Sequence, residues 1–270
     1  MAHVFQVGVG SGGMPVLDMI GRDPRIHRLT LVDPDVYKPH NVQRHLFPVS
    51  AIGQLKVQAA RDWLLERRPE LEIELLPVDL LAPDAQPAIE SAVQGCDIAV
   101  CAVDVEPAKY HFDALMRRHG KPWTLGEVLS GGIGGFVHQF IPGGPCYGCV
   151  CSFLKRSVTT EKEAAPDYSN PAGTVVETTI PASKASITVI ASLHALLTLQ
   201  LLEASGDGEV GFTSLLWTLR RVPGVFDEAF RPYRFKIARL PECLLCHTEA
   251  SQLSGAELNA AVDDALSRLS

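Results

Sequence analysis

The sequence predicts an α/β protein with a Rossmann-like, doubly wound, mostly parallel sheet and an antiparallel extension toward the C-terminus. Apolar strand-like runs alternate with helical patterns over the first 120 residues, as in a parallel sheet with crossover helices. A glycine-rich turn follows the first run, where nucleotide-binding units of this class carry one. After about residue 120 the alternation stops and strand-like segments follow one another. With 270 residues, 46% of them hydrophobic, the chain can bury a full core.

The first half supplies the parallel unit. The Val4–Gly8 run is continuously apolar apart from Gln6, as expected of a buried parallel strand. In the stretch Lys56–Arg68, apolar residues recur at helical spacing. Strands are expected at Val4–Gly8, Leu29–Asp33, Leu71–Leu80 and Asp97–Asp104, and helices at Met14–Gly21, Lys56–Arg68 and Pro107–His119.

The second half supplies the extension. Strands are expected at Trp123–Leu129, Gly135–Ile141, Phe212–Val222 and Tyr233–Leu240. Residues 151–180 are polar and Thr-rich, which predicts a long crossover loop, and Pro181 would open an apolar helix over Ile187–Leu202. We expect one domain over residues 1–250. A short helix over residues 251–270 would begin at the capping box Ser254–Glu257.

Charge and cysteine content exclude several classes of protein. The net charge is −7 and no run of Lys and Arg stands out, so no nucleic-acid groove is expected. Seven cysteines, an odd number, and no signal peptide point to a reducing cytoplasm. Polar residues interrupt the apolar helix, so we expect a buried or interface helix instead of a membrane span.

Two Cys-x-x-Cys pairs stand far apart in the chain. Cys146 and Cys149 form the first pair, and Cys243 and Cys246 form the second. Together they offer four thiolates, the ligand set of a structural Zn²⁺ site. A redox role is the alternative, but such a pair normally opens a helix after a strand, whereas these pairs follow loop-like Gly-Gly-Pro and Leu-Pro-Glu. His247 is an alternative ligand.

The glycine turn predicts a nucleotide site. Gly8, Gly10, Gly12 and Gly13 lie between the first strand and the first helix, where backbone N–H groups and the helix dipole favour phosphate. Asp33, which ends the second strand, is placed to bind ribose hydroxyls. A simple strand-end carboxylate is the alternative, and the turn alone does not distinguish NAD from ATP.

Residues further along favour ATP. Asp35 lies just after Asp33, Asn41 and Arg44 follow it, and Lys56 closes a Gly-Gln-Leu-Lys segment. Arg44 and Lys56 suit a triphosphate, and Asp104, at the end of the fourth strand, suits Mg²⁺. Taken singly, Lys56 could be a surface helix residue and Arg44 a salt-bridged loop residue.

In this combination the motifs resemble the ThiF/MoeB family, the adenylation domain of ubiquitin-activating enzymes and their bacterial relatives. The resemblance runs from about Val4 to Cys246. It implies adenylation of the C-terminal glycine of a ubiquitin-like or sulfur-carrier protein, with release of pyrophosphate. It also implies a homodimer and a downstream conjugating enzyme or sulfurtransferase. The resemblance assigns ribose binding to Asp33, phosphate contacts to Asn41, Arg44 and Lys56, and magnesium binding to Asp104.

Two features depart from the family pattern. Members often supply an arginine from a segment ahead of the first strand, and here that strand is expected to begin at about His3. Members that form a thioester carry a cysteine before the long helix, but Thr174–Pro181 has none. Cys151 is the remaining candidate nucleophile, with Lys155 and Arg156 nearby to lower its pKa. Packing, or a place as an extra thiolate near zinc, is the alternative for Cys151.

Other functions remain open. The chain could be a non-catalytic subunit of a heteromeric activating complex, or it could adenylate a short peptide. An NAD-dependent dehydrogenase would give Arg44, Lys56 and the cysteine pairs no role.

Overall fold

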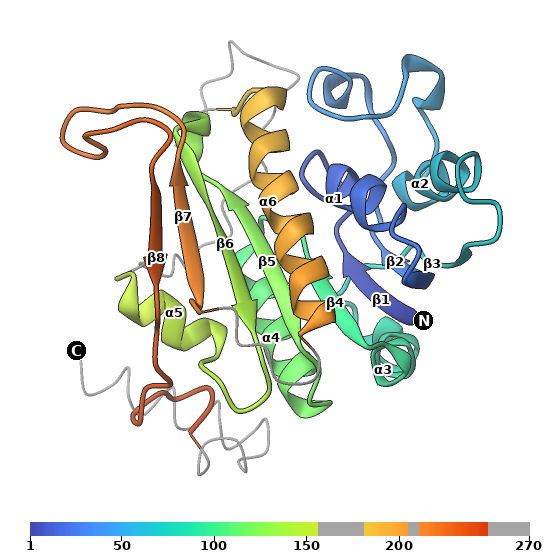
Figure 1. Cartoon of the computed structure of the whole chain (residues 1–270). Coiled ribbons are helices and arrows are strands. Elements are labelled where there is room, and N and C mark those ends of the chain that lie inside the picture. Colours follow the sequence, from blue (N-terminus) through green and yellow to red (C-terminus); the bar gives the residue numbers. More distant parts are fainter. Residues whose placement is uncertain (156–180, 205–210, 248–270) are drawn as a thin grey trace.

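The computed structural model describes residues 1–155, 181–204 and 211–247. Within these residues, eight strands form one sheet in the order β3-β2-β1-β4-β5-β6-β7-β8. The pairs from β3 to β5 are parallel, and those from β5 to β8 are antiparallel. The predicted mixed α/β sheet is thereby confirmed (Figure 1). The strands are β1 Ala2–Val7, β2 Ile26–Val32, β3 Glu72–Leu76, β4 Ile98–Cys101, β5 Trp123–Val128, β6 Gly134–Phe140, β7 Ser214–Thr218 and β8 Pro232–Phe235.

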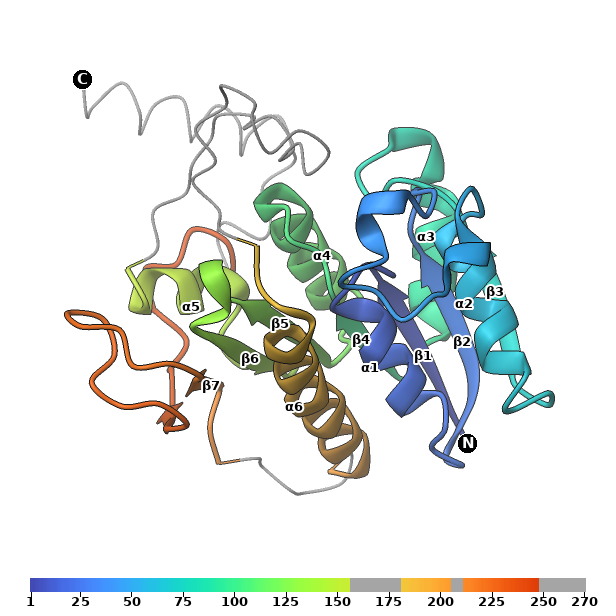
Figure 2. The same cartoon turned by 90° about the horizontal axis from the view of Figure 1, so that it is seen from above.

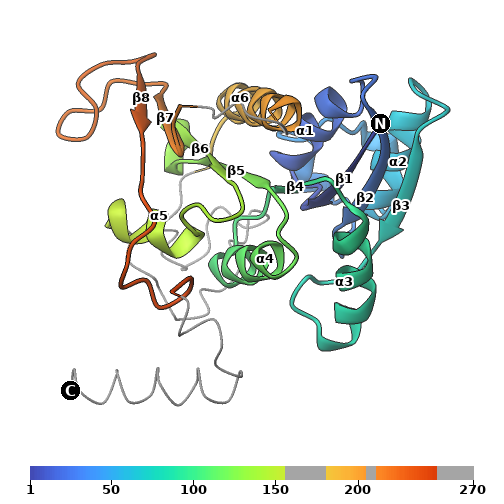
Figure 3. The ribbon, with the colours of Figure 1, turned by 60° about the horizontal axis from the view of Figure 1, so that its bottom comes forward.

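Helices cover both faces of the sheet. Figures 2 and 3 show α1 and α6 on one face and α4 on the other. The helices are α1 Gly13–Ile20, α2 Lys56–Leu65, α3 Gln86–Gly95, α4 Glu106–Arg118, α5 Tyr147–Phe153 and α6 Lys184–Glu203. Short 3₁₀ turns occur at Pro39–Asn41, Val49–Ala51, Pro83–Ala85 and Ser130–Gly132.

The centre of the sheet is buried on both sides. Val4 of β1 pairs with Leu29 of β2 and with Ile98 of β4, and none of the three is exposed. One apolar cluster packs these strands against α1, α2 and α6, and a second packs the sheet against α3, α4 and α5. Burial of a side chain of this size contributes roughly 1.5–3 kcal/mol. The glycine turn therefore follows a strand that is buried on both faces.

Helix α6 is the core helix of the antiparallel half. Its length and apolarity would allow it to cross a membrane, a property no other helix shares in the described part of the chain. It packs on α1, β5 and β6, and Nε2 of its buried His194 lies 3.0 Å from Oγ1 of Thr124. The helix begins at Lys184 with Ser183 as its cap, so placing Pro181 in the first turn was wrong.

Several other expectations were imprecise. Strands β3, β7 and β8 are shorter than the segments expected for them. Helix α3 was missed, because only Ile89, Ala92 and Val93 in it are buried and the apolar period is short. Strand β4 ends at Cys101, three residues before Asp104. The crossover loop was predicted from residue 151, yet α5 continues to Phe153. The rest of that loop and the helix predicted over residues 251–270 lie outside the described residues.

Candidate functional site

The glycine turn leads from β1 into α1, and its four glycines serve two purposes. Gly8 has φ +93°, and a Cβ there would lie 2.4 Å from the carbonyl oxygen of Ala102. A Cβ on Gly13 would lie 2.1 Å from the carbonyl oxygen of Gly8. Packing therefore requires glycine at both positions. A Cβ on Gly10 or Gly12 would meet nothing within 4 Å, so the backbone there is open to a ligand.

Gln6 fastens the two ends of this turn. Its Nε2 donates to the carbonyl oxygens of Gly8, at 2.9 Å, and Gly13, at 3.0 Å. The side chain is fully buried within β1. Gln6 was not expected to take part in the site, although a polar residue inside an otherwise apolar strand was the available signal.

Asp33 lies directly beneath the turn, just past the end of β2. Its Oδ2 accepts a hydrogen bond from the Val9 N–H at 2.7 Å, and its Oδ1 accepts one from the Asp35 N–H at 2.9 Å. Burial raises the pKa of Asp33, while Lys56 and the two N–H groups act in the opposite direction. Each carboxylate oxygen accepts more than one hydrogen bond, so both still have capacity for sugar hydroxyls.

Lys56 reaches the same region from the first turn of α2. Its Nζ lies 2.6 Å from Oδ2 of Asp35, and its backbone N–H donates to the Asp35 carbonyl at 2.9 Å. Lys56 is only 8% exposed, whereas the Asp35 side chain is 60% exposed. The structure thus joins Lys56, Asp35 and Asp33 beside the turn, and the expectation that Lys56 could be a plain surface residue is wrong.

The segment 38–47 closes the other side of the turn. Asn41 Oδ1 accepts from the Lys38 N–H at 2.9 Å, and the Arg44 N–H donates to the Asn41 carbonyl at 3.0 Å. These bonds set Asn41 and Arg44 in one tight bend, with both side chains partly exposed.

His45 ties that bend to the glycine turn. Its Nε2 lies 2.9 Å from the Val9 carbonyl oxygen, and its Nδ1 accepts from the Phe47 N–H at 3.4 Å. Burial, with help from Lys56 and Lys184, lowers the pKa of His45 to about 4. The ring is therefore neutral at pH 7, with its proton on Nε2. His45 therefore holds the backbone of the bend against the glycine turn.

Asp104 lies exposed beyond the end of β4. The Ala102 N–H donates to the Val7 carbonyl at 2.9 Å, so the segment that carries Asp104 starts beside the glycine turn. Within the described residues, four cysteines form the group of metal-binding side chains close enough to share an ion, and Asp104 is not part of it.

That group is Cys146, Cys149, Cys243 and Cys246, all buried. The Sγ separations are 3.7 Å for Cys146–Cys149, 3.5 Å for Cys146–Cys243 and 3.6 Å for Cys149–Cys246. Four thiolates about 2.3 Å from a tetrahedral Zn²⁺ would lie about 3.8 Å apart, so the donor set fits zinc. His247 does not belong to the group.

The same geometry argues against two separate redox-active cysteine pairs. The first pair does open a helix, α5, contrary to the loop expected there. Cys146, however, lies as close to Cys243 of the other pair as to Cys149 of its own. Such equal spacing is a property of one four-thiol site and not of two separate dithiols.

The cysteine cluster and the glycine turn lie at opposite edges of the sheet. Phe140 at the end of β6 pairs with Trp123 at the start of β5. Phe235 at the end of β8 pairs with Ser214 at the start of β7. The segments that continue to the cysteines therefore leave the sheet at the amino edge of the parallel strands, whereas ligands in such sheets bind at the carboxyl edge.

Cys151 lies in α5 and is 4% exposed, with its thiol close to the Tyr110 hydroxyl. It is not part of the four-cysteine group, which excludes a role as an additional ligand in this arrangement. Reactive cysteines are partly exposed and lie near positive charge. The burial of Cys151 favours a packing role over a nucleophilic one.

Residues 1–232 match the ThiF family. The chain belongs to the ThiF family. Its family relatives include the SAMP-activating enzyme E1 of Haloferax volcanii, 27% identical over 55% of this chain and 53% of that protein. The molybdopterin-synthase adenylyltransferase of Escherichia coli K12 is 28% identical over 60% of this chain and 64% of that protein. The ThiF chain thus matches about half to two thirds of the length of these two relatives.

Solved structures share the fold of this ThiF chain. That of E. coli MccB superposes with a TM-score of 0.70 and 17% identity, covering 94% of this chain and 66% of MccB. The complex of MccB with ATP gives a TM-score of 0.64 at 15% identity, covering 91% of this chain and 66% of MccB. At this level of identity the likeness concerns the fold alone.

Proposed function

We propose that this ThiF chain is an ATP-dependent adenylyltransferase that activates the C-terminal carboxylate of a ubiquitin-like or sulfur-carrier protein. The observation that carries the proposal is the joining of Asp33, Asp35 and Lys56 beside an open glycine turn. A dinucleotide site has no need of a buried lysine at that position. The names of the relatives, an activating enzyme and an adenylyltransferase, point in the same direction.

The proposed reaction needs positioning more than proton transfer. A carboxylate oxygen of the terminal glycine attacks the α-phosphorus of ATP, the bond from that phosphorus to the bridging oxygen breaks, and pyrophosphate leaves. The attacking carboxylate is already ionised at pH 7, so no general base is required. Asp33 would hold the ribose, the backbone at Gly10 and Gly12 would approach the phosphates, and Lys56 and Arg44 would balance the growing charge.

Two metal ions belong to this proposal. Asp104, an exposed carboxylate at the carboxyl edge, would hold Mg²⁺, which neutralises phosphate charge when bound. The four cysteines would hold Zn²⁺ as a structural ion.

The experiment is exchange of labelled pyrophosphate into ATP, measured with the isolated protein and a β-grasp protein that ends in Gly-Gly. We expect exchange that requires the partner and disappears when its terminal glycine is removed. Activity that appears only after a second subunit is added would identify the chain as part of a heteromeric complex. If a short peptide supports exchange as well as the folded protein, the peptide becomes the proposed substrate.

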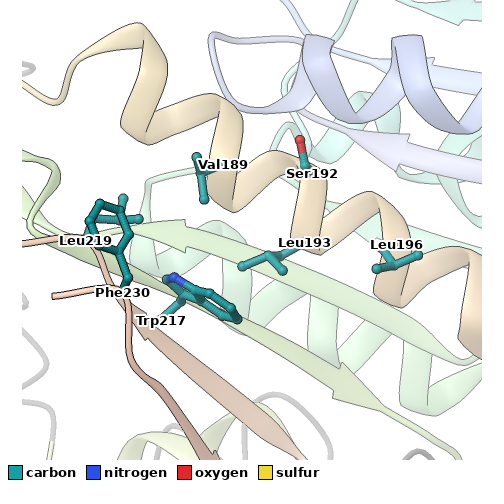
Figure 4. Close-up of a pocket in the computed structure, with 7 residues that line it drawn as sticks. All are labelled: Val189, Ser192, Leu193, Leu196, Trp217, Leu219 and Phe230. Atoms are coloured by element: carbon teal, nitrogen blue, oxygen red, sulfur yellow. The ribbon is translucent and has the colours of Figure 1, made fainter.

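We also propose a homodimer. An apolar hollow of about 360 Å³ lies between α6 and β7 (Figure 4). Leu196 and Phe230 on it are 53% and 72% exposed, and with the other apolar residues of the hollow they form a contiguous patch of the kind that marks a protein interface. The lining consists of Val189, Ser192, Leu193, Leu196, Trp217, Leu219 and Phe230.

The oligomeric state tests the homodimer directly. Light scattering after size exclusion is expected to give twice the chain mass for the native protein and a monomer for Leu196→Glu. A native monomer at micromolar concentration would remove the homodimer from the proposal. A cytoplasmic location is also proposed, because none of the seven cysteines forms a disulfide bond, which suits a reducing compartment. A downstream conjugating enzyme or sulfurtransferase would take over the activated partner.

A further inference from the structure

Lys184 meets the candidate site from a distant part of the chain. It is the first residue of α6, and its Nζ donates to the carbonyl oxygen of His45 at 3.0 Å, across 139 residues of sequence. Figure 1 shows that α6 starts at the sheet edge where the turn from β1 into α1 lies. An ammonium group from the antiparallel half is thereby placed beside the bend that carries Arg44.

The Lys184 ammonium has no acidic partner among the residues that the structure describes. Its hydrogen bond goes to a neutral carbonyl, and the side chain is exposed. Lys56, by contrast, is paired with Asp35. The imidazole of His45 is within the electrostatic range of both ammonium groups. Because that ring is neutral, it neither screens nor adds to the positive charge.

We infer that Lys184 is a further phosphate-binding residue, one that contacts the two outer phosphates of ATP and steadies the leaving pyrophosphate. The inference rests on the proposed function. It assigns the outer phosphates because Lys184 contacts the bend that carries Arg44, and that bend meets the glycine turn at the Val9 carbonyl. Asp33, the proposed ribose ligand, meets the turn at the Val9 N–H instead. A charged phosphate oxygen is a stronger acceptor for an ammonium than a carbonyl oxygen, and a flexible lysine stem can exchange one for the other.

Equilibrium binding separates this role from a merely structural one. The Kd of the α,β-methylene analogue of ATP, which cannot be cleaved between the α- and β-phosphorus, and the Kd of AMP, would be measured by calorimetry in Mg²⁺ buffer. We expect Lys184→Gln to raise the Kd of the analogue about tenfold while the Kd of AMP stays within about twofold. Lys184→Arg keeps the charge and is expected to restore most of the affinity.

Lys121 provides a matched control. Its Nζ donates to the carbonyl oxygens of Gln94 and Cys96, at 2.9 and 2.6 Å, so it makes the same kind of contact near the start of β5. Lys121→Gln should leave both dissociation constants unchanged.

The outcomes distinguish the inference from the proposed function. If Lys184→Gln binds the analogue like the native chain while Lys56→Gln does not, the role of Lys184 is refuted and the nucleotide site stands. Equal losses for AMP and the analogue would show that Lys184 only holds α6 against the bend, which also refutes the inference. A native chain that binds no ATP analogue would overturn the proposed function and the role of Lys184 together.

Discussion

Lys56 and Asp35 are joined twice, once by side chains and once by backbone. Nζ lies 2.6 Å from Oδ2, and the Lys56 N–H donates to the Asp35 carbonyl at 2.9 Å. The pair fixes a mostly buried ammonium at the start of α2. Asp35 was predicted to bind the nucleotide. In the structure it is placed to position the Lys56 ammonium.

Lys56→Gln is expected to lower kcat/KM for pyrophosphate exchange about 100- to 1000-fold, because a fixed charge on the transition state is lost. Asp35→Asn keeps the size of the side chain and is expected to cost about tenfold or less, since Lys56 remains. Steady-state exchange rates at several ATP concentrations provide the comparison. Equal losses in the two variants would mean that Asp35 contacts the nucleotide itself.

Asp104→Ala is expected to abolish exchange, since the variant lacks the carboxylate proposed for Mg²⁺. The side chain is exposed, so the melting temperature should not change. Asp227→Ala, which removes another exposed carboxylate between β7 and β8, serves as the control. Near-normal exchange by the Asp104 variant would remove this residue from the mechanism.

Cys151→Ala is expected to leave activity and partner binding intact, because the thiol is buried in α5. Non-reducing electrophoresis after incubation with ATP and the partner would reveal any thioester. The test is decisive in one direction: a thiol-sensitive adduct in the native protein that is lost in Cys151→Ala would restore this cysteine as the nucleophile.

Zinc removal is expected to destabilise the protein without emptying the nucleotide site, since the two lie at opposite edges of the sheet. Purified protein should contain about one Zn²⁺ per chain. Cys243→Ser should lose the metal and melt several degrees lower, given about 2–4 °C per kcal/mol for a domain of this size. Metal analysis, thermal melting and ATP-analogue affinity would be measured on the same samples. A metal-free native protein with an unchanged melting temperature would refute the structural role.

Acid should weaken the fold through His45. Its pKa is lowered to about 4 in the folded state, so between about pH 6.5 and 4 the unfolded chain binds a proton that the folded chain does not. Stability therefore falls as the pH decreases through that window, by about 2 kcal/mol at pH 5 from this residue. His45→Gln retains a donor for the Val9 carbonyl and should lose less stability between pH 7.5 and 5. Urea unfolding at both pH values measures the difference, and an equal loss in the two proteins would contradict the prediction.

The parallel half of the fold was predictable because its signals are local. The apolar runs of β1, β2 and β4 and the glycine turn follow from neighbours in sequence, and their carboxyl ends necessarily meet at one edge. Helix α3 was missed because its three buried residues make too short a period.

The non-local parts of the site carried no such signal. Lys184 is an ordinary lysine at a helix start, and only the folded chain brings it to His45. The burial of Cys151 depends on the packing of α5 against the body of the protein, with Tyr110 close to the thiol. Cysteine spacing predicted the four-thiol site. The edge of the sheet at which the site lies is set by the reversal of strand direction after β5, which the cysteine spacing does not reveal.

The described residues before position 156 and after position 180 form two interlocking pieces. The piece up to Lys155 holds β1 to β6 and one cysteine pair, and the piece from Pro181 holds α6, β7, β8 and the other pair. Three kinds of contact connect the two pieces. Backbone hydrogen bonds join β6 to β7, α6 packs on β5 and β6, and each piece contributes one cysteine pair to the four-cysteine group. A single break of the peptide chain between these pieces would therefore leave them associated, and the protein could be produced as two co-expressed fragments that reassemble.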